Sequence, residues 1–153
     1  MTPAIRDIGV VDVECGVGVT ITAPSNLYGC VLGDGVFIGP FVEVQRGVTI
    51  GAGTRVQSHT FICELVTIGR DCFIGHGVTF INDLFEDGGP ARGDRAKWRS
   101  TIVGDNVSIG SNATILPVSI CNNTVIGAGA VVTRAIEVAG VYAGNPARLL
   151  RKA

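Results

Sequence analysis

Aromatic side chains and net charge are both scarce in this sequence, and each scarcity excludes a class of function. Aromatics make up 6% of the 153 residues, and 12 Lys and Arg against 13 Asp and Glu leave a net charge of −1. A chain without a global positive field has no general means of holding nucleic acid or an anionic membrane surface, so an anionic ligand must be met by local charges. We therefore predict no nucleic-acid partner and no membrane partner.

Long apolar runs, a leader and paired cysteines are missing as well. No apolar run approaches the 18 or so residues that span a bilayer, and the sequence starts with MTPAIRDIG, which has neither a basic leader nor an apolar stretch. The cysteines are odd in number, widely spread and free of CxxC spacing, which argues against a disulfide framework or a zinc knuckle. They are Cys15, Cys30, Cys63, Cys72 and Cys121. These features favour a cytoplasmic protein that needs no metal.

The sequence has instead a period of six. Steps of six from Leu32 meet only large apolar residues as far as Phe80, and at 46% apolar content the chance for one chosen phase is roughly one in a thousand. The pattern resumes at Val103, slips to a five-residue step at Ile120 and continues to Val138. The first run consists of Leu32, Ile38, Val44, Ile50, Val56, Ile62, Ile68, Ile74 and Phe80.

A period of six matches neither an α-helix nor simple alternation, but it suits short strands that turn a corner each time. Glycine often follows the large residue directly, where it accepts backbone angles that a Cβ would forbid, and the small or β-branched residue at the fourth following position lets coils close. We predict an all-β parallel β-helix with three hexads per coil; the period alone leaves its handedness open. An ordinary β-sandwich would need longer strands and hairpin turns such as Asn-Gly.

The length allows one hydrophobic core, so we predict a single domain over 1–153. Residues 1–26 keep the phase poorly and are expected to form an irregular first coil, and residues 142–153 a C-terminal cap or tail. Residues 82–101 break the hexad with several Gly and one Pro and are expected to form an excursion loop. Such loops often carry the binding function of a regular scaffold, although an unstructured insertion would give the same pattern.

Three hexads per coil should stack residues that are 18 apart. One corner column then holds Arg46, Glu64 and Asn82. The preceding corner holds Phe41, His59 and Gly77, with His76 displaced by one position from that column.

Five stretches carry a resemblance to a known family: QSHTFICELVTIG (57–69), FIGHGVTFINDLF (73–85), VGDNVSIGSNATILPVSIC (103–121), VIGAGAVVTRAI (125–136) and AGNPARLLR (143–151). They make nearly the whole chain resemble the hexapeptide-repeat acyltransferases. The FIND motif, the loop and the ILPVSIC step are similar to the nucleotide-linked 3-amino-sugar N-acetyltransferases, including those that act on dTDP-3-amino-3,6-dideoxyhexoses. The resemblance implies a left-handed β-helix, a homotrimer with sites between subunits, acetyl-CoA as co-substrate, and a place in surface-glycan (lipopolysaccharide) precursor synthesis.

The implied reaction is direct attack of a sugar amine on the thioester. Asn82 and Asp83 match the FIND motif and are our first choice for the acceptor, with Asp83 taking the amine proton or holding the ammonium; an Asx cap of the loop is the alternative. Glu64 is expected either to hold the Asn82 side or to pair with Arg46, which is the favoured reading. Phe85 and Trp98 either stack on the substrate or anchor the loop, and we favour anchoring for Trp98.

His59 and His76 are the only histidines, and an imidazole titrates in the range useful for proton transfer. His59 is the better candidate for a general base or water-mediated proton acceptor, His76 is a candidate substrate contact, and a solvent-facing corner residue is the alternative for both. One hexad of strand spans about 20 Å, so His59 and Asn82 of one chain cannot easily share an amine. We predict that His59 of one subunit and Asn82 or Asp83 of a neighbour line a shared cleft.

For acetyl-CoA we predict a pantetheine groove lined by exposed backbone amides and a basic site for the phosphates. The alternative for the basic residues is a solvated tail with no role in binding. Asn145 and Pro146 are expected to shape the cap beside the cofactor. The amides are those of Ser111, Asn112, Gly127, Ala128 and Gly129, and the basic residues are Arg134, Arg148, Arg151 and Lys152.

Three other functions stay open. Sugar O-acetyl transfer would make His59 indispensable as a base. A gamma-type carbonic anhydrase needs three histidines around zinc, and this chain has two. A non-catalytic β-helix scaffold is the third alternative.

Overall fold

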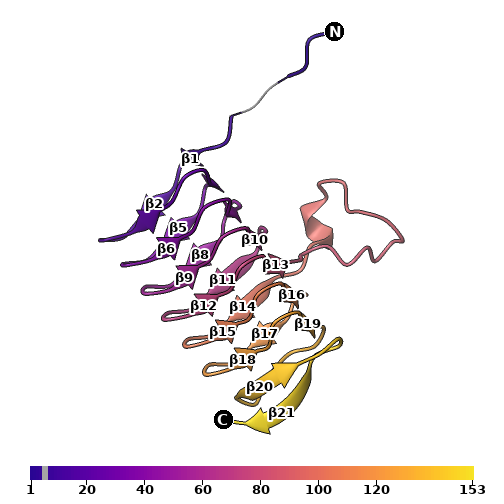
Figure 1. Cartoon of the computed structure of the whole chain (residues 1–153). Helices are drawn as coiled ribbons and strands as arrows, with labels where there is room; N and C mark the ends of the chain where they lie inside the picture. The colour runs from indigo at the N-terminus through magenta and orange to yellow at the C-terminus, as the bar shows by residue number, and fades with distance from the viewer. Residues whose placement is uncertain (5–6) are drawn as a thin grey trace.

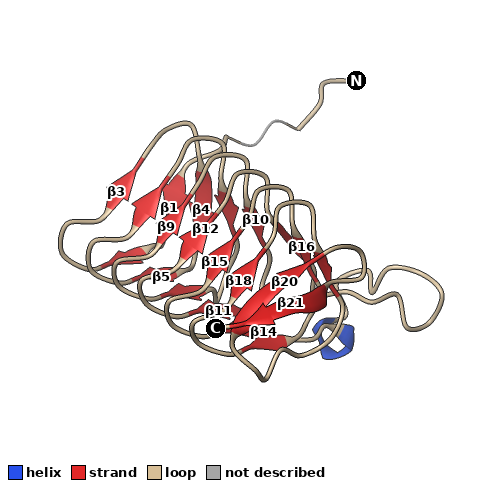
Figure 2. Ribbon diagram, turned by 60° about the horizontal axis from the view of Figure 1, so that its bottom comes forward, coloured by secondary structure: helices blue, strands red, loops and turns tan. Residues whose placement is uncertain are grey.

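The structure is a computed structural model that describes residues 1–4 and 7–153. The chain winds into a parallel β-helix with three flat sides, each side formed by a sheet of very short strands (Figure 1). Successive coils lie directly on one another, as the view along the sheets in Figure 2 shows. This is the parallel β-helix that the hexads predicted, with the left hand that the resemblance implied.

The three sheets take every third strand. Sheet A contains β1 (Val10–Val11), β4 (Asn26–Tyr28), β7 (Glu43–Val44), β10 (Phe61–Ile62), β13 (Thr79–Phe80), β16 (Thr114–Ile115) and β19 (Val131–Val132). Sheet B contains β2 (Glu14–Cys15), β5 (Val31–Leu32), β8 (Thr49–Ile50), β11 (Val66–Ile68), β14 (Thr101–Val103) and β17 (Ser119–Ile120). Sheet C contains β3 (Thr20–Ile21), β6 (Phe37–Ile38), β9 (Arg55–Val56), β12 (Phe73–Ile74), β15 (Ser108–Ile109), β18 (Val125–Ile126), β20 (Gly140–Ala143) and β21 (Arg148–Lys152).

The register confirms three hexads per coil. Val44 pairs with Ile62, which stands exactly three hexads further along the chain. Some coils are one residue shorter than three hexads. One of them pairs Val103 with Ile120, which explains the five-residue step of the repeat at Ile120. The coil that contains the loop pairs Phe80 with Ile115, so the whole loop is inserted between two positions that stack on each other.

The core is the stack of residues that the six-residue period selected. All nine from Leu32 to Phe80 are at most 1% exposed. Two threonines replace valine at the fourth position, and both are satisfied: the hydroxyl of Thr60 donates to the Gly75 carbonyl at 2.9 Å and that of Thr54 to the Gly69 carbonyl at 2.8 Å. Glycine is required at some corners; a Cβ on Gly110 would lie 2.4 Å from the Ala128 nitrogen.

Both ends of the chain are more regular than predicted. Residues 10–21 place one strand in each sheet, paired in register with the next coil, so the expectation of an irregular first coil over 1–26 is wrong for them. This first coil is a single position short of three hexads, which shifts the hexad phase and hides the coil in the sequence. Residues 5 and 6 of that segment lie outside the described residues. At the other end, β20 and β21 form an antiparallel hairpin from Gly140, so the predicted cap is a folded element and not a solvated tail.

The loop leaves the β-helix after β13 and returns at β14, close to the predicted bounds (Figure 1). It contains the 3₁₀ helix η1 (Arg95–Lys97), whose N-cap Asp94 accepts a hydrogen bond from the Ala96 amide at 3.2 Å. At its neck the Arg99 amide donates to the Asn82 carbonyl at 2.9 Å. These bonds order the loop. In the part of the chain that the structure describes, no helix is long and apolar enough to cross a membrane.

Candidate active site

A cavity of about 610 Å³ lies where the loop leaves sheet A. It brings together four residues that the sequence analysis assigned to the acceptor, namely Glu64, Asn82, Asp83 and Phe85, together with Trp98. The remaining lining residues are Tyr28, Gln45, Phe61, Cys63, Thr79, Phe80, Ile81, Leu84 and Leu116. We call this space the loop cavity.

The floor of the loop cavity is a column that the sequence analysis missed. In each strand of sheet A one residue points inward, and the residue directly after it is never glycine. In sheets B and C, glycine often stands at the equivalent position. The register places these side chains one above another on the corner between sheets A and B, hereafter the A–B corner. The column consists of Tyr28, Gln45, Cys63, Ile81 and Leu116. The absence of glycine at this one corner was the signal in the sequence that could have revealed the floor.

Glu64 is fixed at the cavity by contacts from three directions. The Asn82 side-chain amide donates to the Glu64 carbonyl at 3.1 Å, and the Glu64 amide donates to the side-chain oxygen of Gln45 at 3.2 Å. Its carboxylate pairs with Arg95 of the loop, Nη2 to Oε2, at 2.6 Å. The predicted Glu64–Asn82 stacking is therefore confirmed. The predicted ion pair with Arg46 is wrong, because the loop folds back and brings Arg95 to the carboxylate.

The carboxylate of Asp83 caps the loop. One oxygen accepts the Ala91 amide at 2.7 Å and the other accepts the Phe85 amide at 3.0 Å. These backbone hydrogen bonds, with the one from Ala91 contributing most, lower the pKa of Asp83, since they stabilise its charged form. The Asx cap named as the alternative is present, and it fixes a negative charge at the cavity wall. A carboxylate with a lowered pKa is a weak proton acceptor at neutral pH.

Two further titratable side chains line the floor. Burial, assisted by the nearby Glu43 and Glu64 carboxylates, raises the pKa of Tyr28. Burial also raises the pKa of Cys63 to about 12. Both groups are therefore neutral at physiological pH, and the floor offers hydrogen-bonding and apolar contacts without adding charge.

Trp98 lines the loop cavity from the loop side, and the Arg95 guanidinium carbon lies 6.0 Å from its ring centroid. Phe85 also lines the cavity but is 58% exposed. The Trp98 side chain is half-buried and lines the cavity, so its role as an anchor of the loop stays a prediction.

The histidines lie on a different corner. His59 stacks on Phe41 with 4.8 Å between ring centroids, on the corner between sheets C and A, hereafter the C–A corner. Phe41, His59 and Gly77 all have positive φ, as expected for one stacked corner column. His76 precedes Gly77, and its carbonyl accepts the Asn112 amide at 2.8 Å. Neither histidine lines the loop cavity, so one chain does not bring His59 and Asn82 together there.

The predicted pantetheine groove lies on the same C–A corner, but most of its amides are not free. The amides of Asn112, Gly127 and Gly129 donate to carbonyls of neighbouring coils at 2.7 to 2.8 Å. The idea of free amides at these three positions is therefore wrong, because stacking of the coils consumes them. Ser111 and Ala128 share the corner and complete the predicted set.

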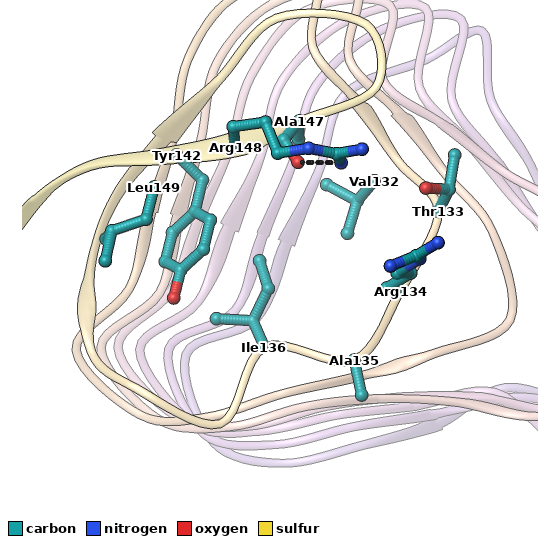
Figure 3. A pocket seen from close by; sticks show the side chains of 9 residues that line it. All are labelled: Val132, Thr133, Arg134, Ala135, Ile136, Tyr142, Ala147, Arg148 and Leu149. Carbon is teal, nitrogen blue, oxygen red and sulfur yellow. Dashed lines mark hydrogen bonds between the residues drawn. The ribbon is translucent and has the colours of Figure 1, made fainter.

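A second cavity, of about 200 Å³, lies beside the C-terminal hairpin, and we call it the hairpin cavity (Figure 3). Two of the predicted phosphate ligands line it. Figure 3 shows the Arg134 and Arg148 guanidinium groups on one side of this space and the Tyr142 ring on the other. Nη1 of Arg148 donates to the Ala147 carbonyl at 2.9 Å. Arg151 and Lys152 belong to exposed β21 and do not line the cavity, and Asn145 and Pro146 form the turn of the hairpin.

The two cavities are neighbours. Leu116 belongs to the loop cavity and Val132 to the hairpin cavity, and the Leu116 amide donates to the Val132 carbonyl at 3.1 Å. Both cavities thus follow the A–B corner on consecutive coils. Among residues 1–4 and 7–153, no group of three His, Cys, Asp or Glu side chains is arranged to hold a metal ion.

Comparison with known proteins identifies the repeat. Residues 29–64 match the bacterial transferase hexapeptide and residues 100–134 match the hexapeptide repeat of succinyl-transferase. Both matched stretches are therefore similar to the hexapeptide repeats of bacterial transferases. Over 107 residues the hexapeptide-repeat chain is 37% identical to the bifunctional protein GlmU of Stenotrophomonas maltophilia (strain R551-3), which covers 69% of this chain and 21% of GlmU. The chain thus spans about a fifth of the length of the GlmU proteins that it matches.

Solved structures of two acyltransferases share the fold. AntD, an N-acyltransferase from Bacillus cereus crystallised as a mutant with dTDP and coenzyme A, superposes with a TM-score of 0.80 at 23% identity over 91% of this chain and 83% of that chain. A mutant of perosamine N-acetyltransferase from Caulobacter crescentus, in complex with CoA and GDP-perosamine, superposes with a TM-score of 0.73 at 21% identity over 89% of this chain and 58% of that chain. At these identities the likeness establishes the fold.

Proposed function

We propose that this chain is an acyl-CoA-dependent N-acyltransferase that acetylates the free amine of a nucleotide-linked amino sugar. The observation that carries the proposal is the loop cavity, where Glu64, Asn82 and Asp83 converge on a β-helix built from transferase hexapeptides. The opening is surrounded by the Asp83 carboxylate, the Asn82 side-chain amide and the Glu64 carboxylate, whose charge Arg95 balances. Such an opening suits a ligand rich in hydrogen-bond donors, and a sugar amine is one.

The acceptor we propose is a dTDP-3-amino-3,6-dideoxyhexose. Apolar side chains of Phe61, Ile81 and Leu116 form much of the cavity, which favours a deoxy sugar with few hydroxyl groups over a fully hydroxylated one. AntD was crystallised with dTDP and perosamine N-acetyltransferase with GDP-perosamine, so the same fold accommodates nucleotides and amino sugars elsewhere. Phe85 and Trp98 then contact the sugar or its nucleotide, and the product serves cytoplasmic synthesis of a surface-glycan precursor.

The donor we propose is acetyl-CoA, bound along the hairpin. Arg134 and Arg148 provide two positive charges at the hairpin cavity, which suits the phosphates of the donor. Asn145 and Pro146 shape the turn above them, Arg151 adds positive potential from β21, and the C–A corner contributes Ser111 and Ala128 beside the pantetheine arm. The hairpin cavity adjoins the loop cavity at Leu116 and Val132, so the proposed phosphate site lies beside the proposed acceptor site.

The proposed reaction is direct acyl transfer. The amine nitrogen attacks the thioester carbonyl carbon, a C–N bond forms, the C–S bond breaks, CoA leaves as a thiolate and the nitrogen loses one proton. A neutral amine is a good nucleophile and a thiolate a good leaving group, so the chain contributes mainly orientation and charge. Glu64 and Asp83 hold the amine, Asn82 orients it, and no covalent enzyme intermediate is required.

The proton acceptor we propose comes from a neighbouring subunit of a homotrimer. His59 and Asn82 lie on different corners, and a hexad spans about 20 Å, so His59 reaches the amine of another chain more easily than that of its own. His76 lies on the same C–A corner and would contact substrate in the same cleft.

A thiol-release assay tests the function. Purified protein is incubated with acetyl-CoA and a panel of nucleotide-linked sugars that carry an amine, or a hydroxyl at the same position. We expect CoA release with an amino sugar and little with its hydroxyl counterpart. Release only with hydroxyl acceptors would establish an O-acetyltransferase, and no binding of acetyl-CoA in a thermal-shift titration would favour a non-catalytic scaffold.

A further inference from the structure

The loop makes one charged contact with the β-helix. Of the three ion pairs in the described part of the chain, Lys97–Asp87 at 2.6 Å and Arg99–Glu86 at 2.9 Å join two loop residues. The third, Arg95–Glu64, joins the loop to the A–B corner of the preceding coil. Its acidic member is the least exposed of the six side chains, since Glu64 is 16% exposed, whereas Arg95 is 56% exposed and the side chains of the two loop pairs are 44 to 68% exposed.

Glu64 offers Arg95 a fixed and shielded partner. Its Oε2 atom is buried, and no aligned hydrogen bond reaches it within the described residues, so the Arg95 guanidinium is the group that compensates its charge. A carboxylate withdrawn from water is costly without such compensation. The Glu64 backbone is held at the same time by Asn82 and Gln45, so the anchor itself cannot follow a moving loop.

Arg95 connects this anchor to the cavity wall. It begins η1, and its guanidinium carbon lies 6.0 Å from the centroid of Trp98, which follows η1 and lines the loop cavity. A shift of Arg95 therefore shifts the ring that closes the cavity on the loop side. The two other loop ion pairs have no partner on the β-helix and cannot determine this position.

We propose that Arg95 is a positioning residue for the acceptor: by pairing with Glu64 it holds Trp98 in place as the wall of the loop cavity. The proposal rests on the proposed function in one respect, namely that the loop cavity binds the amino sugar. The position of the wall itself does not depend on any activity, and it can be measured separately.

Trp98 is the only tryptophan of the chain, so intrinsic fluorescence reports on the wall directly. We expect Arg95→Gln to shift the emission to longer wavelength and to raise acrylamide quenching roughly twofold, because the ring becomes accessible to water. Lys97→Gln removes the same charge from the same short helix and should leave both unchanged. Unchanged fluorescence in Arg95→Gln, with the far-ultraviolet circular dichroism of the folded protein, would overturn the proposal even if the protein proves inactive.

Kinetics test the role in acceptor binding. Arg95→Gln should raise KM for the amino sugar roughly tenfold with little change in KM for acetyl-CoA, and Arg95→Lys should recover part of the loss. Glu64→Gln combined with Arg95→Gln should cost less than the sum of the single variants, because both remove one interaction. Equal effects on both substrates, or additive effects in the double variant, would overturn the positioning role, whereas failure of every acceptor would refute the proposed function and leave the fluorescence result standing.

Discussion

The side-chain amide of Asn82 donates a hydrogen bond at 3.1 Å to the backbone carbonyl of Glu64, which occupies the equivalent position of the preceding coil. The side chain of Asn82 thus bonds to the preceding coil, while its backbone carbonyl accepts a hydrogen bond from the Arg99 amide at the neck of the loop. Asn82 therefore connects the start of the loop both to the β-helix and to the end of the loop.

Replacing Asn82 tests this junction. Asn82→Asp keeps the size of the side chain but removes the N–H donor, and we expect it to lower the free energy of unfolding by about 1 kcal/mol, the usual net value of one hydrogen bond. The KM for the acceptor should rise together with the loss of stability, because the neck and the cavity share this residue. Denaturant unfolding and steady-state kinetics measure the two effects; stability equal to that of the unaltered chain would contradict the junction.

Asp83 is expected to act as a fixed charge and not as a titrating base. Its pKa lies below the ordinary value of 3.8 because the Ala91 and Phe85 amides stabilise the carboxylate. A group whose folded pKa is lowered contributes stability above its unfolded pKa and loses it as the pH falls through the folded pKa, so the loop should loosen only below about pH 3.8. Trp98 fluorescence followed from pH 8 to pH 2 checks this.

The same reading predicts the kinetics of Asp83→Asn. We expect kcat/KM for the acceptor to fall roughly tenfold, mainly through KM, with the shape of the pH profile between pH 6 and 9 preserved. A loss of 10² or more confined to kcat, together with disappearance of one limb of the profile, would instead identify Asp83 as the general base.

Subunit mixing tests the shared cleft. If His59 and Asp83 serve one site from two chains, His59→Ala and Asp83→Ala proteins should each lose activity roughly tenfold or more, and co-expressed mixed trimers should regain about one third of the unaltered sites. Activity is measured on trimers purified through two different tags. Mixed trimers that stay as inactive as either parent would place His59 outside the mechanism.

The hairpin cavity makes a prediction that distinguishes two nearby arginines of the same strand. Arg148→Glu should raise KM for acetyl-CoA at least roughly tenfold, since Arg148 lines the cavity and a charge-assisted hydrogen bond is worth about 1.5 to 3 kcal/mol. Arg151→Glu should have a smaller effect, because Arg151 lies on exposed β21 outside the cavity. Equal effects would indicate only a general basic surface.

Thiol labelling tests burial at the cavity floor. Cys63 lines the loop cavity but is 3% exposed, and burial raises its pKa to about 12, so at pH 8 it has almost no thiolate. Iodoacetamide should modify exposed Cys15 quickly and spare Cys63 and Cys30, whose pKa is raised to about 11 for the same reason. Mass spectrometry of native and denatured samples gives the pattern; rapid native labelling of Cys63 would mean that the floor is open.

The hexads predicted the coil because every strand needs a large apolar residue at the same position. This period is visible in the sequence without any knowledge of distant contacts. The same reasoning failed at the first coil, where an offset just short of three hexads moved Cys15 and Ile21 out of the phase that begins at Leu32. The register does stack Arg46 on Glu64, but the predicted ion pair between them was wrong, since a column counts residues within the coils and takes no account of a loop that folds back.

Spacing along the chain was enough to predict the β-helix, the departure of the loop at Asn82, and the column that joins Asn82 to Glu64. Three contacts became visible only in the folded chain: Arg95 reaches Glu64, the Asp83 carboxylate caps the loop, and coil stacking engages the Gly127 and Gly129 amides. The physical reason is that the period describes neighbours in register, whereas these contacts depend on the path of an irregular segment and on which hydrogen-bonding groups the packed coils leave free.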